Sequence, residues 1–376
     1  MGVRLALPAL LLALLLPGAA AARSVPQGFY GAVYDGAVAN APPQVQDAQF
    51  ARMARAGVES VRAVFSWADA QPAQGGSFDF TASDQLVALA AEHGVSLLPV
   101  VIYTPEWARA DLSTAASPPE HVSDYTAYLS ALAHRYGSAG TFWKEHRKFP
   151  RRPLTYWQIW NEPHLRLYWN ASHWQRGYAA LLKASHVALR QADPKARTVL
   201  AGLTGTSWNA LASLYKLGKV KGAFDVAALQ TYTGSARHLL LAVHLFRAVL
   251  AGHGAARMPL WLTEIGWPAA SGHIKVPSYQ RTIATTKLGM AKRLFEGYAL
   301  LAQQRRARSV RVSRVYWYSW ASSYTRTSQV GIGIFRYAGL FRFNGTSFRE
   351  QPAFVAYRRS ARQHEGCRKA SSGVCS

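Results

Sequence analysis

The amino-acid sequence predicts an α/β protein folded as a single (β/α)8 barrel, the TIM barrel. Eight apolar segments rich in β-branched residues alternate with eight amphipathic segments along the chain of 376 residues. Most of these strand segments are apolar on both faces, as parallel strands covered by helices are. A doubly wound open sheet is the alternative. It is disfavoured because Tyr34-Asp35-Gly36-Ala37 follows the first strand, where that fold needs a Gly-rich phosphate loop.

The predicted elements follow one another in regular order. Apolar runs predict strands at residues 29–34, 60–65, 96–102, 155–160, 198–203, 224–231, 259–263 and 312–320. Amphipathic segments between them predict helices at residues 45–56, 84–93, 122–136, 174–191, 209–217, 236–251, 279–304 and 353–363. Gly57 and Gly94 follow two helices as left-handed C-caps, and Ser83 and Ser123 are the expected N-caps of two others. In such a barrel the carboxyl ends of the strands carry the chemistry.

The chain divides into three predicted parts, at residues 1–22, 23–365 and 366–376. The first is typical of a secretory signal, with Arg4 before an apolar stretch and a cleavage site near Ala22. An uncleaved N-terminal anchor is the alternative. The second is the barrel, and the third carries Cys367 and Cys375, which a disulfide could join in an exported protein. We therefore expect a secreted or extracytoplasmic monomer without stable membrane insertion after signal cleavage.

The charge of the chain is strongly positive, with 43 lysines and arginines against 19 acidic residues and a formal net charge of +24. This balance indicates either an anionic partner or a solvated basic surface. The basic runs at residues 147–152 and 305–308 precede predicted strands four and eight, on the barrel face away from the chemistry. No nucleic-acid-binding motif accompanies them, so no nucleic-acid partner is expected. We also expect no metal and no other cofactor, since no histidine pair at ligand spacing lies near the two cysteines.

Two glutamates stand out among the acidic residues. Glu162 lies in Trp160-Asn161-Glu162-Pro163, directly after predicted strand four. Glu264 lies at the end of predicted strand seven. A strand-end acid without a special role is the alternative for each. Two carboxyl groups across one barrel mouth are nevertheless what glycoside hydrolysis requires, one protonated to assist the leaving oxygen and one ionised.

With this pair, the sequence resembles glycoside hydrolase clan A, the retaining glycosidases whose catalytic glutamates follow strands four and seven. Trp160-Asn161-Glu162-Pro163 most resembles family 39 and its bacterial exopolysaccharide endoglycosidase relatives, with family 5 next. The resemblance implies that Glu162 is the acid/base and Glu264 the nucleophile. It also implies supporting roles for four residues: Asn161 on the sugar 2-hydroxyl, Arg62 beneath the nucleophile, Tyr232 donating to the nucleophile, and Trp320 as the sugar platform.

The chain departs from this pattern in three places. Many clan members carry histidine at the end of strand three, where this chain has Tyr103. The segment Glu264-Ile265-Gly266-Trp267-Pro268 also resembles the nucleophile region of family 17 glucanases. Family 39 xylosidases carry an appended β-sandwich, and the residues after Trp320 are too few for a large one.

Aromatic residues are concentrated after the predicted strands. Six tryptophans fall in loops of the catalytic face: Trp67, Trp107, Trp169, Trp208, Trp267 and Trp320. Sugar rings present apolar faces that stack on aromatic rings, although core packing is the alternative for any one tryptophan. We expect Trp67 and Trp107, together with Trp320, to bind substrate.

These observations predict a secreted retaining β-glycoside hydrolase that cleaves a polysaccharide or oligosaccharide by double displacement. A non-catalytic carbohydrate-binding barrel of the cell envelope is one alternative. A transglycosylase on the same scaffold is another.

Overall fold

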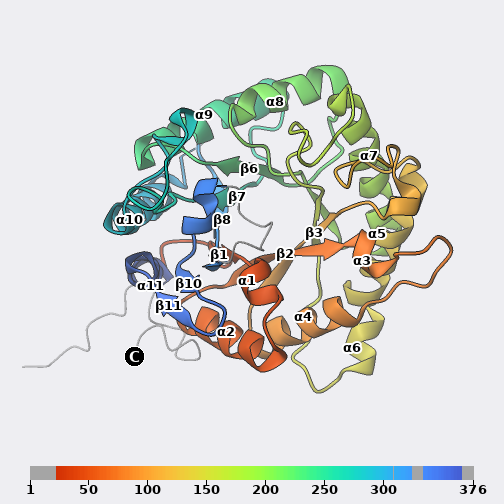
Figure 1. Ribbon diagram of the computed structural model, residues 1–376. Helices are drawn as coiled ribbons and strands as arrows, with labels where there is room; N and C mark the ends of the chain where they lie inside the picture. Colours follow the sequence, from red (N-terminus) through yellow and green to blue (C-terminus); the bar gives the residue numbers. More distant parts are fainter. Residues whose placement is uncertain (1–22, 308, 324–332, 366–376) are drawn as a thin grey trace, which may run out of the picture.

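Eight parallel strands form the inner layer of the computed structural model, which describes residues 23–307, 309–323 and 333–365 (Figure 1). They are β1 Tyr30–Val33, β2 Ser60–Ser66, β3 Ser96–Ile102, β4 Tyr156–Ile159, β5 Arg197–Val199, β6 Ala227–Thr231, β7 Leu260–Ile265 and β8 Val312–Trp317. Their hydrogen-bonded order is β5-β4-β3-β2-β1-β8-β7-β6. Two parallel bridges, Val199 to Val226 and Leu203 to Leu229, join the two ends of this order. The strands therefore close into the predicted (β/α)8 barrel.

Helices form the outer ring around the strands (Figure 1). The long ones are α2 Pro43–Arg55, α4 Thr81–Glu92, α5 Val122–Tyr136, α7 Trp174–Ala192, α8 Ser207–Ser213 with the π-helical turn Leu214–Gly218, α9 Ala236–Gly252, α10 Lys287–Gln304 and α11 Pro352–Glu365. Short helices occupy the connections: α1 Gly36–Ala39, α3 Trp67–Ala70, α6 Thr141–Glu145, and the 3-10 turns Glu106–Ala108, Ser278–Gln280 and Gly333–Tyr337. Each predicted helix thus has a counterpart in the structure.

The burial pattern explains why these segments form a barrel. Every residue of β6 and β7 is buried, as expected for strands with side chains on one face in the barrel and on the other under helices. In α2, Phe50 and Met53 are fully buried while Arg55 is exposed, so one stripe of the helix faces the strands. Burying a side chain of this size contributes roughly 1.5–3 kcal/mol.

The helix ends confirm one kind of cap and correct another. Gly57 and Gly94 have φ of 90° and 71°, the left-handed conformation predicted for C-caps. Ser83 and Ser123 are not N-caps, because α4 already begins at Thr81 and α5 at Val122. The Ser83 hydroxyl instead donates to the Phe80 carbonyl oxygen at 3.0 Å.

A small second sheet was not predicted. It contains β9 Ala321–Ser323, β10 Phe341–Phe343 and β11 Phe348–Glu350, in the order β11-β10-β9. The chain enters it directly from the barrel, so the predicted strand 312–320 is too long, and β8 ends at Trp317. The predicted helix 279–304 is also too long, since α10 begins at Lys287, after the N-cap Thr286.

The predicted signal segment 1–22 and the tail carrying Cys367 and Cys375 lie outside the described residues. Within the described ranges, no helix has both the length and the apolar character needed to cross a membrane. The basic segments 147–152 and 305–307 lie directly before β4 and β8, at the amino ends of the strands. Their predicted position opposite the catalytic face is therefore confirmed.

Candidate active site

The two glutamates face the same end of the barrel from β4 and β7. Both are buried to the same degree, with 8% of each residue exposed. Glu264 lies within β7, and Glu162 lies three residues after the end of β4. The backbone turns sharply there, because Trp160 and Glu162 have φ of 67° and 41°. A non-glycine residue in this conformation costs about 1–3 kcal/mol and is found mainly at functional sites.

Arg62, on β2, joins the two sides of the mouth. Its three donor nitrogens reach three side chains on or directly after β7 and β4: Nη1 donates to Glu264 Oε1, Nη2 to Asn161 Oδ1 and Nε to Gln158 Oε1, each at 2.7 Å. Only 5% of Arg62 is exposed, so water does little to screen these contacts. The guanidinium therefore balances the charge of Glu264 and fixes Asn161 in one orientation.

Gln230, on β6, is a site residue that the sequence reasoning missed. Its Nε2 donates to Glu264 Oε1 at 3.0 Å and to Asn161 Oδ1 at 2.8 Å. A Cβ at Gly202 would lie 2.5 Å from that nitrogen, so only glycine leaves room for the Gln230 side chain. The sequence pattern that could have identified Gln230 is a single amide side chain in an otherwise apolar parallel strand. Gln158 on β4 shows the same pattern.

Tyr232 donates a hydrogen bond to the second oxygen of Glu264, Oε2. Burial and the negative charge of Glu264 raise the pKa of the Tyr232 hydroxyl well above its ordinary value. It therefore stays a donor. Its ring packs edge-on against Phe335 at 4.7 Å and against Tyr318 at 6.2 Å, which fixes the hydroxyl beside the carboxylate.

Glu162 has the opposite electrostatic setting. Burial, followed by the negative charge of Glu264, raises the pKa of Glu162 well above its ordinary range. Arg62 and a hydrogen bond with the Thr204 side chain act in the other direction but do not reverse the shift. Glu162 therefore holds a proton at pH values where an exposed glutamate would have lost it.

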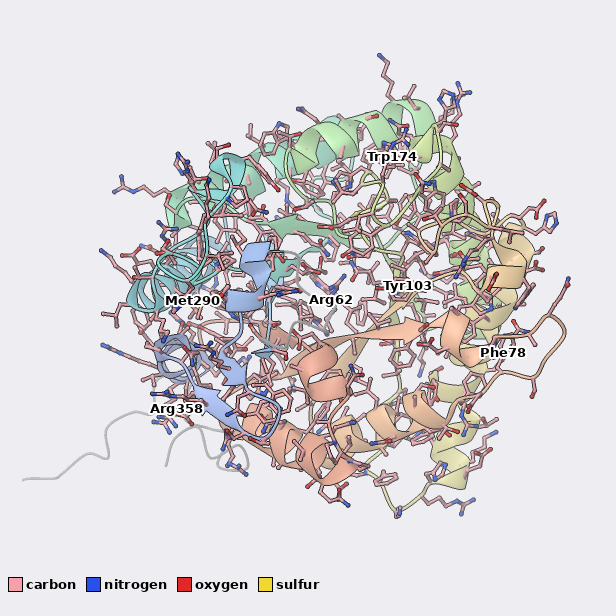
Figure 2. All side chains as sticks on the ribbon, viewed as in Figure 1. Arg62, Phe78, Tyr103, Trp174, Met290 and Arg358 are labelled. Carbon is pink, nitrogen blue, oxygen red and sulfur yellow. The ribbon has the colours of Figure 1, made fainter. Side chains whose placement is uncertain are left out.

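Three tyrosines complete the wall of the mouth, and none was predicted as a site residue. Tyr103 follows β3, Tyr168 follows β4 and Tyr318 follows β8. Burial raises the pKa of all three hydroxyls, and the negative charge of Glu264 adds to each shift. The Tyr318 ring also packs against Tyr232, the donor to Glu264. Tyr103 is 42% exposed and has φ of 68°, so its ring stands in the open part of the mouth. Figure 2 shows Tyr103 farther from the centre of the ring than Arg62.

Trp320 does not lie where the resemblance implied. It is fully buried, its Nε1 donates to Gln49 Oε1 at 3.0 Å, and its ring packs against Phe341 and Phe354. A ring enclosed between the barrel and the small sheet offers no face to a sugar. The expected platform at Trp320 is therefore wrong. Tyr318 is the aromatic residue after β8 that is near Glu264.

The other predicted tryptophans divide into packing residues and partly open ones. Trp67, Trp169 and Trp267 are buried, and the substrate-binding role expected for Trp67 does not fit its full burial. Its Nε1 donates to Gln71 Oε1 at 3.0 Å, so this ring supports a loop. Trp107 and Trp208 are half-buried. Of the two, Trp107 lines a cavity at the rim.

The site contains no arrangement suited to a metal. Across residues 23–307, 309–323 and 333–365, no three His, Cys, Asp or Glu side chains form a group that could hold one. What the mouth brings together is a carboxylate with three donors, a second carboxyl group with a raised pKa, and an oriented amide. That set can perform acid–base and nucleophilic chemistry at one carbon atom.

Comparison with known proteins identifies relatives of matching architecture. The family model described as Beta-galactosidase matches residues 39–137. The search of curated proteins found no match. Among solved structures, a monomeric beta-xylosidase from Caulobacter crescentus CB15 is 19% identical, with a TM-score of 0.63 over 90% of this chain and 69% of that one.

Two further solved structures show the same likeness. The family 39 glycoside hydrolase from Xanthomonas axonopodis pv. citri is 18% identical, with a TM-score of 0.63 over 90% of this chain and 67% of that chain. A fungal beta-1,4-galactanase is 15% identical, with a TM-score of 0.59 over 88% and 99% of the two chains. At these identities the structural likeness shows the shared barrel. The family-model match, over residues 39–137, is consistent with the predicted resemblance to the clan A glycosidases.

Proposed function

We propose that this protein is a secreted retaining β-glycoside hydrolase acting on a polysaccharide or oligosaccharide, with Glu264 as nucleophile and Glu162 as acid/base. One observation carries the proposal: two equally buried glutamates have opposite surroundings. Glu264 accepts hydrogen bonds from Arg62, Gln230 and Tyr232, whereas burial and the charge of Glu264 keep Glu162 protonated. Glycoside hydrolysis by double displacement needs this division between two carboxyl groups.

In the first step, an oxygen of Glu264 bonds to the anomeric carbon while the bond from that carbon to the leaving oxygen breaks. Oε1 of Glu264 already accepts two hydrogen bonds and Oε2 only one, so Oε2 is the attacking atom. The proton of Glu162 moves to the leaving oxygen. The products are a glycosyl ester on Glu264, an ionised Glu162 and a free alcohol.

In the second step, water takes the place of the alcohol. Glu264 has lost its charge as an ester, so one of the causes that raises the pKa of Glu162 is gone. Glu162 now accepts a proton from water, whose oxygen bonds to the anomeric carbon as the ester bond breaks. Glu264 returns to its ionised form beside Arg62, and the sugar leaves with its original anomeric configuration.

Asn161 is positioned to hold the sugar. Its Oδ1 accepts from Arg62 Nη2 and Gln230 Nε2, which fixes which end of the amide is the donor. No acceptor in the described part of the chain takes the Asn161 Nδ2 hydrogens. Asn161 is therefore the residue that binds the sugar 2-hydroxyl, a contact that strengthens as charge develops in the transition state.

The open aromatic mouth supports a polymeric substrate. Tyr103, directly after β3, is 42% exposed. Val64, near the end of the adjacent strand β2, is 49% exposed, so the mouth is wide beside Arg62. The predicted signal segment supports export, which would bring the enzyme to extracellular polymers. The solved relatives are described as a xylosidase, a galactanase and other glycosidases, so pentose and hexose polymers both belong in the first substrate panel.

Product analysis on that panel tests the proposal. Polysaccharides with β-linked neutral sugars are incubated with the enzyme, and released fragments are sized by mass spectrometry. Proton NMR recorded during the first minutes then reports the anomer formed first. New reducing ends with the β-anomer formed first are expected. An initial α-anomer would contradict retention, glycan binding without new reducing ends would favour a carbohydrate-binding barrel, and longer chains would indicate a transglycosylase.

A further inference from the structure

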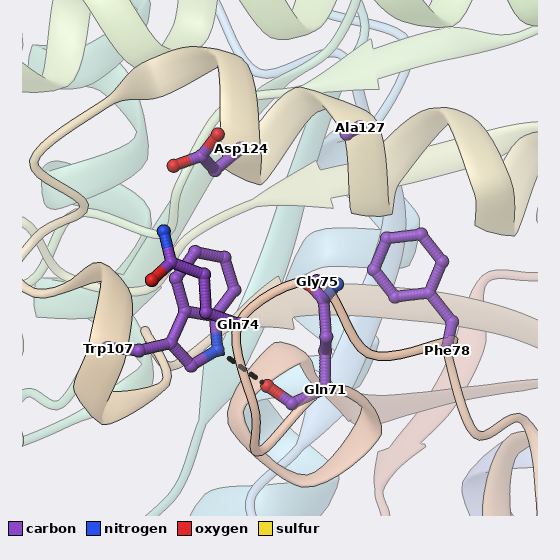
Figure 3. Close-up of a pocket in the computed structure, with 7 residues that line it drawn as sticks. All are labelled: Gln71, Gln74, Gly75, Phe78, Trp107, Asp124 and Ala127. Atoms are coloured by element: carbon purple, nitrogen blue, oxygen red, sulfur yellow. Dashed lines mark hydrogen bonds between the residues drawn. The ribbon is translucent and has the colours of Figure 1, made fainter.

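A cavity of about 220 Å³ lies at the rim of the barrel, outside the mouth that holds the two glutamates (Figure 3). The loop after α3 contributes Gln71, Gln74 and Phe78, the loop after β3 contributes Trp107, and the first turn of α5 contributes Asp124. We call this cavity the rim pocket. It joins two connections that follow β2 and β3, so it belongs to the catalytic face.

The aromatic wall of the rim pocket is held in place by neighbouring groups. Trp107 Nε1 donates to the Gln71 carbonyl oxygen at 2.9 Å (Figure 3). The Trp107 ring also meets Trp67 edge-on at 5.6 Å. The Gln71 side chain is fully used, because its Oε1 accepts from Trp67 and its Nε2 donates to the Gly76 carbonyl oxygen at 2.8 Å. The ring of Trp107 is therefore oriented before any ligand arrives, which lowers the entropy cost of binding.

Two polar side chains of the rim pocket have no protein partner. Gln74 is exposed and Asp124 half-buried, and neither side chain hydrogen-bonds to any group in the described part of the chain. An amide supplies donors and acceptors and a carboxylate supplies acceptors, so together they can bind neighbouring hydroxyl groups. An aromatic face beside hydroxyl-binding side chains is the composition of a sugar site. The negative charge of Asp124 disfavours an acidic sugar at this position.

Tyr103 lies between the rim pocket and the catalytic mouth. Its backbone carbonyl oxygen accepts from the Ala68 N–H of α3 at 3.1 Å, and 42% of the residue is exposed in the open part of the mouth. In Figure 2, Arg62 is near the centre of the ring, Tyr103 is farther out, and Phe78 of the rim pocket is near the periphery on the same side. A chain held at Glu264 and leaving over the exposed ring of Tyr103 therefore reaches the rim pocket.

We propose that the rim pocket is a distal subsite that binds a neutral pyranose unit of the polysaccharide, stacked on Trp107 and hydrogen-bonded to Gln74 and Asp124. The inference rests on the proposed function, because it assigns the rim pocket to the substrate of the same active site. It implies that the enzyme binds long chains more tightly than short ones and favours cleavage inside a chain over cleavage at its end.

The test measures oligosaccharide affinity in a chain that cannot cleave its ligand. Isothermal titration with xylohexaose, β-1,4-galactohexaose and β-1,4-mannohexaose is performed on Glu264→Gln, alone and combined with Gln74→Ala, Asp124→Asn or Trp107→Ala. Gln191→Ala, an exposed glutamine at the far end of α7, is the matched control. Gln74→Ala and Asp124→Asn should each weaken binding of the accepted hexasaccharide about tenfold, and Gln191→Ala should not change it.

Trp107→Ala should have the largest effect, but this ring also packs on Trp67, so the two polar variants decide the question. Equal affinity of the Gln74, Asp124 and Gln191 variants, or no binding of any of the three hexasaccharides, would overturn the distal subsite. Cleavage of the bound hexasaccharide by the unmodified enzyme is measured in parallel and concerns the proposed function alone. Hexasaccharide binding that depends on Gln74 without any turnover would refute the hydrolase and retain the subsite.

Discussion

The two glutamates at the barrel mouth are equally buried, yet the groups around them differ completely. Glu264 lies inside β7, where β2, β6 and the segment after β6 supply three donors to its two oxygens. Glu162 lies beyond the end of β4 on a backbone of positive φ and forms no ion pair with a cation in the described part of the chain. Burial and the charge of Glu264 therefore outweigh the opposing influence of Arg62 and raise the pKa of Glu162.

This difference shows how one residue type can perform two tasks at one site. Burial alone would favour the protonated form of both carboxyl groups. The position along the strand decides which of them obtains donors, because hydrogen-bonding side chains of other strands, such as Arg62 of β2 and Gln230 of β6, meet Glu264. The following predictions test that comparison, from the largest expected effect to the smallest.

Replacing the nucleophile should produce the largest loss. Glu264→Gln preserves the shape of the side chain but removes the attacking charge, so kcat/KM should fall by about 10⁴-fold or more on every accepted substrate. Glu296→Gln, an exposed substitution on α10, is the matched control and should keep full activity. Substantial activity in Glu264→Gln, measured on purified protein free of revertant enzyme, would refute its role.

Replacing the acid should give a loss that depends on the leaving group. Glu162→Gln should reduce kcat/KM by roughly 10²–10⁴-fold on a natural oligosaccharide, whose leaving oxygen needs a proton. The loss on a 2,4-dinitrophenyl glycoside, whose leaving group needs none, should be far smaller in the first step. The alkaline fall in activity should also disappear, since it reports ionisation of Glu162. Equal losses on both substrates would contradict the acid role.

Removing the Arg62 cation should make the surroundings of Glu264 resemble those of Glu162. Arg62→Met leaves Glu264 buried without its ion pair, so the free energy of unfolding should fall by about 3–5 kcal/mol at neutral pH. The deficit should shrink in a Glu264→Gln background, because no buried charge is then left without its partner. Urea unfolding in the two backgrounds measures this, and a deficit of equal size in both would mean that packing, not charge, is the cause.

Tyr232→Phe should have a smaller effect. The substitution removes one of three donors to Glu264 and keeps the ring that packs on Phe335. We expect a loss of about tenfold in kcat, with little change in the unfolding midpoint. The matched variant Tyr178→Phe removes a buried tyrosine hydroxyl that hydrogen-bonds to backbone groups. Its unfolding midpoint should fall, whereas its kcat should change little.

The smallest effect concerns stability and pH. The pKa of Glu162 is raised in the folded state, so the unfolded chain releases this proton first as pH rises. The contribution of Glu162 to folding is therefore complete below the pKa of the unfolded glutamate, about 4.3, and is lost as pH rises through the folded pKa. Relative to Glu162→Gln, the unmodified protein should lose up to about 1.4 kcal/mol per pH unit in that window. If the free energy of unfolding of the two proteins changed in parallel with pH, the raised pKa of Glu162 would be contradicted.

The sequence predicted those features that a single segment of the chain determines. Apolar runs located all eight barrel strands, because parallel strands need apolar side chains on both faces. Few carboxylates follow strands, so Glu162 and Glu264 could be singled out by position. The residues 161 and 162 follow β4 in the structure as predicted, and Arg62 and Tyr232 both contact Glu264.

The sequence was less informative where distant segments meet. The bonds of Gln230 to Glu264 and Asn161 depend on strand register around the barrel, which local patterning does not reveal. Trp320 was misplaced because residues 312–320 form one apolar run, while the chain leaves the barrel after Trp317 to pair in the small sheet. The two predicted serine caps were wrong for a simpler reason: α4 begins at Thr81, before its predicted start, and α5 begins at Val122, one residue before Ser123.

Trapping the covalent intermediate tests the central claim most directly. A 2-deoxy-2-fluoro β-glycoside with a 2,4-dinitrophenyl leaving group slows both steps but spares the first more than the second, so the glycosyl ester accumulates. Peptide mapping by mass spectrometry then locates the added sugar. The account predicts one sugar per chain, on the peptide that contains Glu264. A sugar on the Glu162 peptide, or turnover of an accepted sugar through an inverted product without any label, would contradict it.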